Sequence, residues 1–280
     1  MTSLIKIIAV AILLSVSGLS AQNFQGQATY KTKRKVDVKL DSTQMSGEMQ
    51  QRMMEMLKKQ FEKTFVLSFN KEASIYKEEE SLSAPQPAGM QVVMFDSGGA
   101  DVLYKNTKEN RFTNQNDVFG KVFLIKDNLE ALEWKMSGEK KNIGNYECFK
   151  ATITGEREVR DGGVSFNGDK DLDESENVRM EPYTITAWYS PEIPVNNGPG
   201  RYFGLPGLIL EVNDGQETVI CSKIVINPKE KLSIVEPKKG KEVTQAEFDE
   251  ILQKKMEEMN ERYRPSGDND GERIEIRIGG

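Results

Sequence analysis

Histidine is missing from all 280 residues of the sequence. Because histidine is the commonest general base and metal ligand, its absence excludes serine–histidine and cysteine–histidine catalytic pairs. The two cysteines alone cannot supply the usual zinc site of four cysteine and histidine ligands. Any catalysis would have to use carboxylates, lysine or tyrosine. We therefore expect a protein that is not an enzyme and that carries no cofactor.

Long apolar runs are also scarce, and the one at 7–14 is too short to span a membrane, which needs about 20 residues. It follows Lys6 and precedes small residues that end at Ala21, the arrangement of a cleavable signal peptide. We expect the signal peptide to cover 1–21 and the mature chain to begin at Gln22. No cysteine lies near the expected cleavage site. The sequence therefore predicts an exported protein, periplasmic or secreted, that is not a lipoprotein.

Basic residues are outnumbered, with 38 lysines and arginines against 44 aspartates and glutamates and a net charge of −6. An acidic surface argues against nucleic acid as a partner and against docking on anionic lipid headgroups. The expected partners are therefore a hydrophobic or peptide ligand, or another protein of the cell envelope.

Cysteine occurs only at Cys148 and Cys221. Outside the cytoplasm the two could form a disulfide. Each lies in its own strand-like segment, and the sequence does not show whether these strands meet. A disulfide and two buried free thiols both remain open.

Strand patterns dominate the chain. Short segments in which apolar and polar residues alternate are separated by polar turns, which is typical of an antiparallel sheet. The Asp214-Gly215 pair favours a tight hairpin. We therefore predict an α+β protein that is mainly antiparallel β. The expected strands are 26–40, 65–76 with a turn at Asn70, 102–106, 111–114, 121–126, 133–136, 146–154, 184–190, 208–212, 217–226 and 274–278.

Two helices are expected to pack on this sheet. The first covers about 47–63, and the second runs from a capping box at Thr244 and Glu247 to about Tyr263. The apolar face of the first helix consists of Met49, Met53, Leu57 and Phe61. That face is interpreted as an adaptable core surface, with a flexible floor for a hydrophobic ligand and a copper(I) site as alternatives.

The mature chain, 22–280, is expected to form a single domain with irregular loops at about 81–89, 162–181 and 227–243. The second loop carries Asp169, Asp171 and Asp173, a spacing found in calcium-binding loops. The glycine and the final glutamate of an EF-hand are missing from it. A solvated acidic loop is therefore favoured over a weak calcium site.

The most specific motif is Gly204-Leu205-Pro206-Gly207-Leu208-Ile209. Its central four residues fit a type II turn, in which proline fixes φ at the second position and glycine takes a positive φ at the third. We favour a structural corner that leads into a strand, with a ligand-facing loop as the alternative.

The motif resembles that of the GLPGLI proteins of Bacteroidetes, which are named for these six residues. The agreement extends to further positions, namely Trp188, Tyr189, Pro191, Gly198, Pro199 and the upstream Gly144, Tyr146, Cys148 and Ala151. The resemblance is specific from about Asn142 to Cys221. It implies an exported protein whose biochemical role is unassigned, and it transfers no catalytic residue.

A long curved antiparallel sheet with one early and one late helix is similar in architecture to the LolA-type lipoprotein carriers, which are half-open barrels with an apolar groove. By this analogy the sequence predicts a non-catalytic binding or carrier protein of the cell envelope, with a hydrophobic or peptide ligand. The alternative is an interaction protein for an outer-membrane partner. A carboxylate-based hydrolase has no identifiable residue pair in its support.

Overall fold

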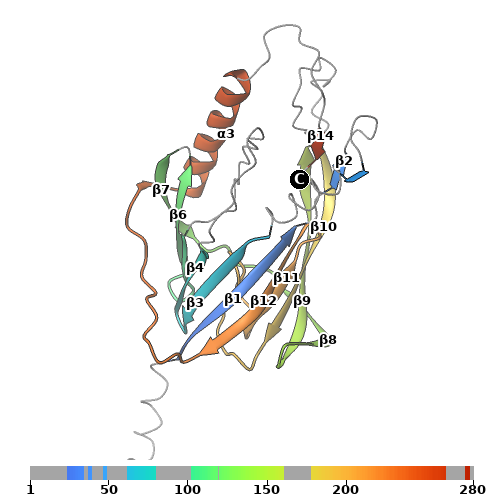
Figure 1. Ribbon diagram of the computed structural model, residues 1–280, viewed down its shortest axis with the longest axis vertical. Helices are drawn as coiled ribbons and strands as arrows, with labels where there is room; N and C mark the ends of the chain where they lie inside the picture. The colour runs from blue at the N-terminus through green and yellow to red at the C-terminus, as the bar shows by residue number, and fades with distance from the viewer. Residues whose placement is uncertain are drawn as a thin grey trace, which may run out of the picture.

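The computed structural model describes residues 24–34, 37–39, 47–48, 62–79, 102–118, 120–160, 178–262 and 275–277. Within these ranges the fold consists of one large sheet, one small sheet and the helix α3 (Figure 1). The elements are β1 (Gln25–Arg34), β2 (Asp37–Lys39), β3 (Thr64–Asn70), β4 (Ala73–Glu78), β5 (Val102–Asn106), β6 (Arg111–Val118), β7 (Lys121–Asn128), β8 (Lys135–Ile143), β9 (Tyr146–Arg160), β10 (Val178–Ser190), β11 (Leu208–Asn213), β12 (Glu217–Ile226), β13 (Lys241–Val243), α3 (Gln245–Arg262) and β14 (Glu275–Arg277).

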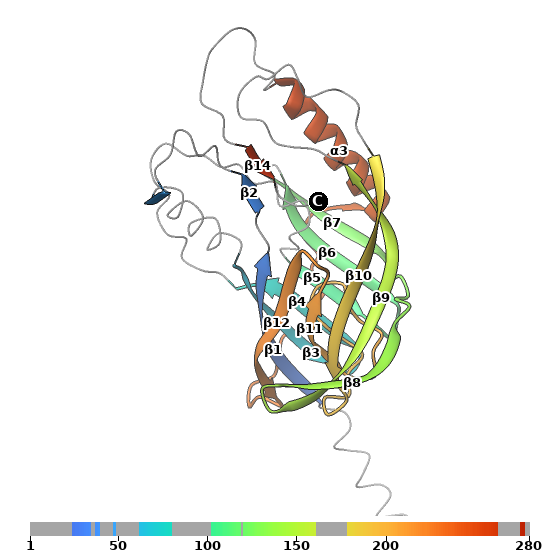
Figure 2. The ribbon, with the colours of Figure 1, turned by 90° about the vertical axis from the view of Figure 1, so that its right-hand side faces the viewer.

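The large sheet has twelve strands in the order β13-β7-β6-β5-β4-β3-β1-β12-β11-β10-β9-β8, and β2 pairs with β14 in the small sheet. Every pairing in the large sheet is antiparallel except that of β13 with β7. The sheet is open and strongly curved, and α3 lies at its β7 end (Figure 2). The prediction of a mainly antiparallel sheet is thus confirmed.

Alternation of side chains places one face of each central strand in the core. Along β1, Ala28, Tyr30 and Thr32 are buried, whereas Lys31 and Lys33, which alternate with them, are exposed. Successive residues of a strand point to opposite faces, so this pattern buries one face and solvates the other. The same logic was readable in the sequence, and it accounts for the correct prediction of most strands.

The segment between β10 and β11 packs into the larger hydrophobic cluster rather than lying on the surface. Ile193, Val195 and Phe203 belong to this cluster together with residues of β1 and β3 to β7. The buried Tyr30 hydroxyl donates to the Ile209 carbonyl over 2.7 Å, which joins β1 to the start of β11. We call residues 191–207 the crossing loop.

The motif glycines serve a different purpose from the one predicted. Gly207 does not have a positive φ, whereas Gly204 does, at 98°. A Cβ at Gly207 would lie 2.2 Å from the Ser190 carbonyl oxygen, so glycine is needed for close backbone approach rather than for the turn. Leu205, Leu208 and Ile209 are all buried. The type II turn prediction is therefore wrong about the role of Gly207.

The second helix matches its prediction. The Thr244 N–H and hydroxyl both donate to Glu247 Oε2, over 2.8 and 3.1 Å, and the Glu247 N–H donates back to Thr244 Oγ1 over 3.2 Å. This reciprocal capping box fixes where α3 begins. The first expected helix is not confirmed, because only residues 47–48 of it are described as helical and residues 62–63 have no regular secondary structure.

Some loop boundaries need correction. Residues 178–181, expected to be irregular, begin β10, and residues 241–243 form β13. The paired strand β9 extends to Arg160, so β10 can start early as its antiparallel partner. The rest of 227–243 has no regular structure. The expected signal peptide at 1–21 and the expected loop at 81–89 lie outside the described residues.

The contact of Gly207 with Ser190 generates the first prediction. Gly207→Ala should lower the free energy of unfolding by at least about 3 kcal/mol, because the new methyl group meets backbone that cannot move aside. Gly138→Ala is the matched control, since a Cβ there meets nothing within 4 Å, and it should change stability by less than about 0.5 kcal/mol. Urea denaturation measures both, and equal stabilities would contradict the close-approach argument.

Candidate functional site

A groove of about 680 Å³ lies between α3 and the β7 end of the sheet. Most of its lining is apolar. The lining residues are Val118, Lys121, Val122, Phe123, Lys241, Phe248, Ile251, Leu252, Lys255 and Glu258. Phe123 and Phe248 meet edge to face with ring centroids 5.5 Å apart, and this pair joins the helix to the sheet. Small-molecule sites commonly enclose about 300–1,000 Å³, so the groove has the size of a ligand site.

The helix presents a continuous stripe to this groove. Phe248, Ile251, Leu252 and Lys255 follow one another at the i, i+3, i+4 and i+7 spacing of a single helix face. Phe248 is buried, whereas Ile251 and Leu252 are only half-buried although they are apolar. The described residues therefore leave part of this apolar stripe uncovered.

Three lysines and one glutamate add charge to the groove. Lys255 pairs with Glu258 on the next turn of α3. Lys241 pairs in register with Phe123, and Lys121 precedes Phe123 by two residues, so both lysines lie on the same face of the sheet as the aromatic ring. The ammonium groups of Lys121 and Lys241 thus flank the sheet side of the groove.

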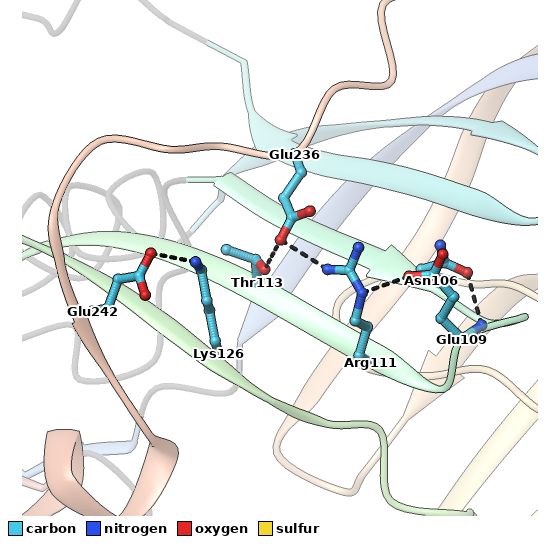
Figure 3. Close-up of polar contacts among 7 residues, drawn as sticks. All are labelled: Asn106, Glu109, Arg111, Thr113, Lys126, Glu236 and Glu242. Carbon is cyan, nitrogen blue, oxygen red and sulfur yellow. Dashed lines mark hydrogen bonds and ion pairs between the residues drawn. The ribbon is translucent and has the colours of Figure 1, made fainter.

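A strap formed by residues 227–240 connects β12 to β13 and runs across β6 and β7 (Figure 3). Glu236 Oε1 accepts hydrogen bonds from Arg111 Nη1 over 2.8 Å and from Thr113 Oγ1 over 2.5 Å. These bonds, chiefly that from Arg111, lower the pKa of Glu236, and the same pairing raises the pKa of Arg111. Further along, Glu242 pairs with Lys126 (Figure 3). The strap is therefore attached to the sheet at Glu236, a few residues before β13. The first residue of β13, Lys241, lines the groove.

The turn between β5 and β6 supports this attachment. Asn106 Oδ1 accepts the N–H groups of Lys108 and Glu109 over 3.1 and 2.9 Å, which closes the turn. Glu109 in turn accepts from Arg111 Nε over 2.6 Å. Arg111 is therefore held between Glu109 of the turn and Glu236 of the strap.

Lys105, on β5, forms hydrogen bonds with the backbone of the crossing loop. Its side chain is fully buried, and its ammonium donates to the carbonyls of Gly198 over 2.8 Å and Tyr202 over 3.1 Å. Burial lowers the pKa of Lys105 to about 7, because desolvation disfavours the charged form. The crossing loop is thus fixed to β5 through the amino group of a lysine side chain that has no contact with bulk solvent.

The crossing loop also reaches α3. The guanidinium of Arg201 lies over the Phe112 ring at 4.6 Å and donates to Gln245 Oε1 at the start of the helix. Asp127 Oδ2 accepts the Gln245 N–H over 3.2 Å from the end of β7. The first turn of α3 is consequently positioned by both the crossing loop and the sheet.

Cys148 and Cys221 are both free thiols, and both are buried in the larger cluster. Burial raises the pKa of Cys148 to about 11 and that of Cys221 to about 12. A raised pKa keeps a thiol protonated and inert near neutral pH. Of the two interpretations left open by the sequence, the structure has the buried thiols.

The other motif residues occupy varied positions. Tyr189 and Pro199 are buried, and Pro191 is exposed at the start of the crossing loop. Trp188 is half-buried beneath Lys141 Nζ, which lies 4.4 Å from the ring centroid. The backbone of Gly198 accepts from Lys105, and a Cβ there would lie 2.8 Å from that of Ile209. These residues pack the crossing loop and do not line the groove.

Two predicted sites cannot be placed. The Met49, Met53, Leu57 and Phe61 face and the Asp169, Asp171 and Asp173 run lie outside the described residues. Among the residues that the structure does describe, no cluster of three or more acidic or cysteine side chains could hold a metal ion. In that same part of the chain, no helix is both long enough and apolar enough to cross a membrane.

The groove is not evident from the sequence. The helix was predicted from its capping box, but β6, β7 and β13 supply the other wall of the groove, and the pairing of β13 with β7 joins residues more than 100 positions apart. No local sequence pattern indicates that Lys121 and Lys241 line the same groove.

Comparisons with known proteins add a family match and a low structural similarity. A family model described as a protein of unknown function (Porph_ging) matches residues 134–211, from the segment before β8 into β11. No curated protein has a significant sequence match. Crystal structures of a protein named PNGF-II in space groups C2 and P21 are similar, at 15% and 14% identity and TM-scores of 0.44 and 0.45.

Each of these alignments covers 82% of this chain, which spans only about a third of the PNGF-II chains, at 33% and 34%. The family match contains the whole crossing loop and the Gly204–Ile209 motif but none of the groove-lining residues.

The buried ammonium of Lys105 generates a pH prediction. Between its folded pKa of about 7 and the ordinary value of 10.5, the unfolded chain binds more protons at this position than the folded chain. Stability should therefore rise with pH across that window, by up to about 1.4 kcal/mol per pH unit from this group. Urea denaturation at pH 7, 8 and 9 should show this rise in the wild type relative to Lys105→Met.

Lys231→Met, at an exposed position on the strap, is the control and should follow the wild-type pH profile. Parallel profiles for the wild type and Lys105→Met would show that the buried ammonium does not titrate in this range.

The strap generates a second pH prediction. Glu236→Gln should lower the free energy of unfolding at pH 7 by about 1 kcal/mol, a modest effect because Arg111 is 37% exposed. Since the folded pKa of Glu236 is lowered, its contribution is complete at neutral pH and is lost as pH falls below about 4.5 through the folded pKa. The difference between wild type and variant should shrink steadily as pH falls below about 4.5, while Glu230→Gln should match the wild type throughout.

Proposed function

We propose that this protein is an exported, non-catalytic binding or carrier protein whose ligand occupies the groove between α3 and β7. The observation that carries the proposal is the partly uncovered apolar stripe of α3 facing Phe123 across about 680 Å³. Half-buried apolar side chains that face a space of this size are typical of sites for hydrophobic ligands.

The groove is built from elements that are fixed independently of one another. α3 is capped at its start, held by Asp127 and Arg201, and preceded by β13, which pairs with β7. The strap is pinned through Glu236. Rigid support on several sides allows a groove to exist before its ligand arrives, which reduces the entropy lost on binding.

The proposed cellular setting comes from the sequence. A signal peptide at 1–21 would export the chain, and the motif at Gly204–Ile209 supports a relation to the GLPGLI proteins, with the matched family model covering the same region. We place the protein in the periplasm or outside the cell as part of the same proposal. Immunoblots of fractionated cells test this part, and a cytoplasmic protein with an uncleaved N-terminus would contradict it.

A neutral fluorescent probe, N-phenyl-1-naphthylamine, tests the groove directly with purified, delipidated protein. We expect saturable binding with a 1:1 stoichiometry. Leu252→Glu should weaken this binding at least tenfold, because it places a carboxylate within the apolar stripe. The matched control is Gln253→Glu, which adds the same charge at the next, exposed position and should leave probe binding unchanged.

Thermal unfolding of both variants verifies that the fold is retained. If wild-type protein shows no saturable fluorescence change, or if Leu252→Glu and Gln253→Glu behave alike, the groove is not the binding site.

A further inference from the structure

We infer that the ligand of this groove is a single-chain anionic amphiphile, a fatty acid, whose carboxylate is bound by Lys121 and Lys241. The inference rests on the proposed function and specifies the ligand class of the same site. It depends on three features, namely the sign of the charge at the groove, its position relative to the apolar lining, and the shape of that lining.

The charge of the groove is opposite in sign to that of the molecule. The chain has a net charge of −6, yet three of the residues that line the groove are lysines and Glu258 alone is acidic. Lys255 and Glu258 form an ion pair with each other. The remaining positive charge therefore belongs to Lys121 and Lys241, which is complementary to an anionic headgroup.

The two lysines occupy one side of the groove. Lys241 on β13 is the register partner of Phe123, and Lys121 is two residues before Phe123 on β7. Val118 pairs with Lys121 across β6 and β7, so the same face continues with an apolar side chain. Nearby, the carboxylate of Glu247 is already bonded to the N–H and hydroxyl of Thr244. An acid entering between the lysines would meet two ammonium groups beside an aromatic ring.

The apolar lining is elongated rather than round. Phe248, Ile251 and Leu252 extend along one face of α3 for more than a turn, and the stripe ends at the Lys255–Glu258 pair. A narrow apolar strip on the helix, faced by Lys121 and Lys241 on the sheet side of the same groove, fits one acyl chain with a terminal acid. A neutral hydrophobic ligand would use the strip and bring no anionic group to either lysine, whereas the charge of Lys241, within the part of the chain that the structure describes, otherwise acts only to help lower the pKa of Glu247.

Displacement of the neutral probe by two matched ligands tests this inference. Dodecanoate and 1-dodecanol share the same chain length and differ in the charged headgroup. At about 20 mM salt we expect dodecanoate to displace the probe at least about tenfold more effectively. The preference should shrink at about 300 mM salt, because exposed charges are screened.

The double variant Lys121→Glu/Lys241→Glu should abolish the preference for dodecanoate while leaving displacement by 1-dodecanol within about twofold of wild type. The control Lys231→Glu/Lys239→Glu makes the same change in charge at two exposed positions outside the groove lining and should keep the wild-type preference. Thermal unfolding confirms that the variants are folded.

The possible outcomes separate the two proposals. If both ligands displace the probe equally from wild type, or if the double variant keeps its preference, the fatty-acid inference is wrong and the hydrophobic groove stands. If neither ligand nor probe binds wild type, the proposed function is wrong and the inference with it. Displacement by an acidic amphipathic peptide but not by dodecanoate would assign the groove to peptides and overturn the inference.

Discussion

The ammonium of Lys105 joins two parts of the sheet that are not neighbours. β5 is the fourth strand of the large sheet, whereas the crossing loop connects β10 and β11 on the other side of β1 and β12. Burying an ammonium is unfavourable, and the two carbonyls of Gly198 and Tyr202 offset part of that cost. The crossing loop is therefore attached to β10 and β11 through the chain and to β5 through the hydrogen bonds of Lys105. The position of Arg201, and through it the first turn of α3, depends on this attachment.

The packing of the crossing loop gives the Gly204–Ile209 motif a structural role. Ile193, Val195, Phe203 and Leu205 are buried, and Gly207 allows the chain to pass against Ser190 at the distance of backbone contact. The buried side chains of this loop fill part of the interior of the curved sheet, together with side chains of the strands. The residues of the motif thus pack in the interior of the fold, while the groove lies at the sheet's β7 end with a different set of residues.

The sequence allowed correct prediction of features that depend on local patterns. Alternation in β1 and the capping box at Thr244 are each decided by residues within a few positions of one another. The predicted role of Gly207 was wrong. The contact that requires glycine there is with Ser190, at the end of the preceding strand. The groove was missed for a related reason, since Lys241 becomes the neighbour of Phe123 only when β13 pairs with β7. Long-range register is not encoded in a window of adjacent residues.

An open sheet exposes two edges at which another chain could add a strand. At one edge β13 covers Phe123, Leu124 and Ile125, the most apolar part of β7, with only three residues. At the other edge the pairing of β8 with β9 shifts register between Met136 and Lys140, which interrupts the flat ladder that a new strand would need. The short parallel strand thus has a second consequence besides placing Lys241. It limits edge-to-edge aggregation of a sheet that never closes on itself.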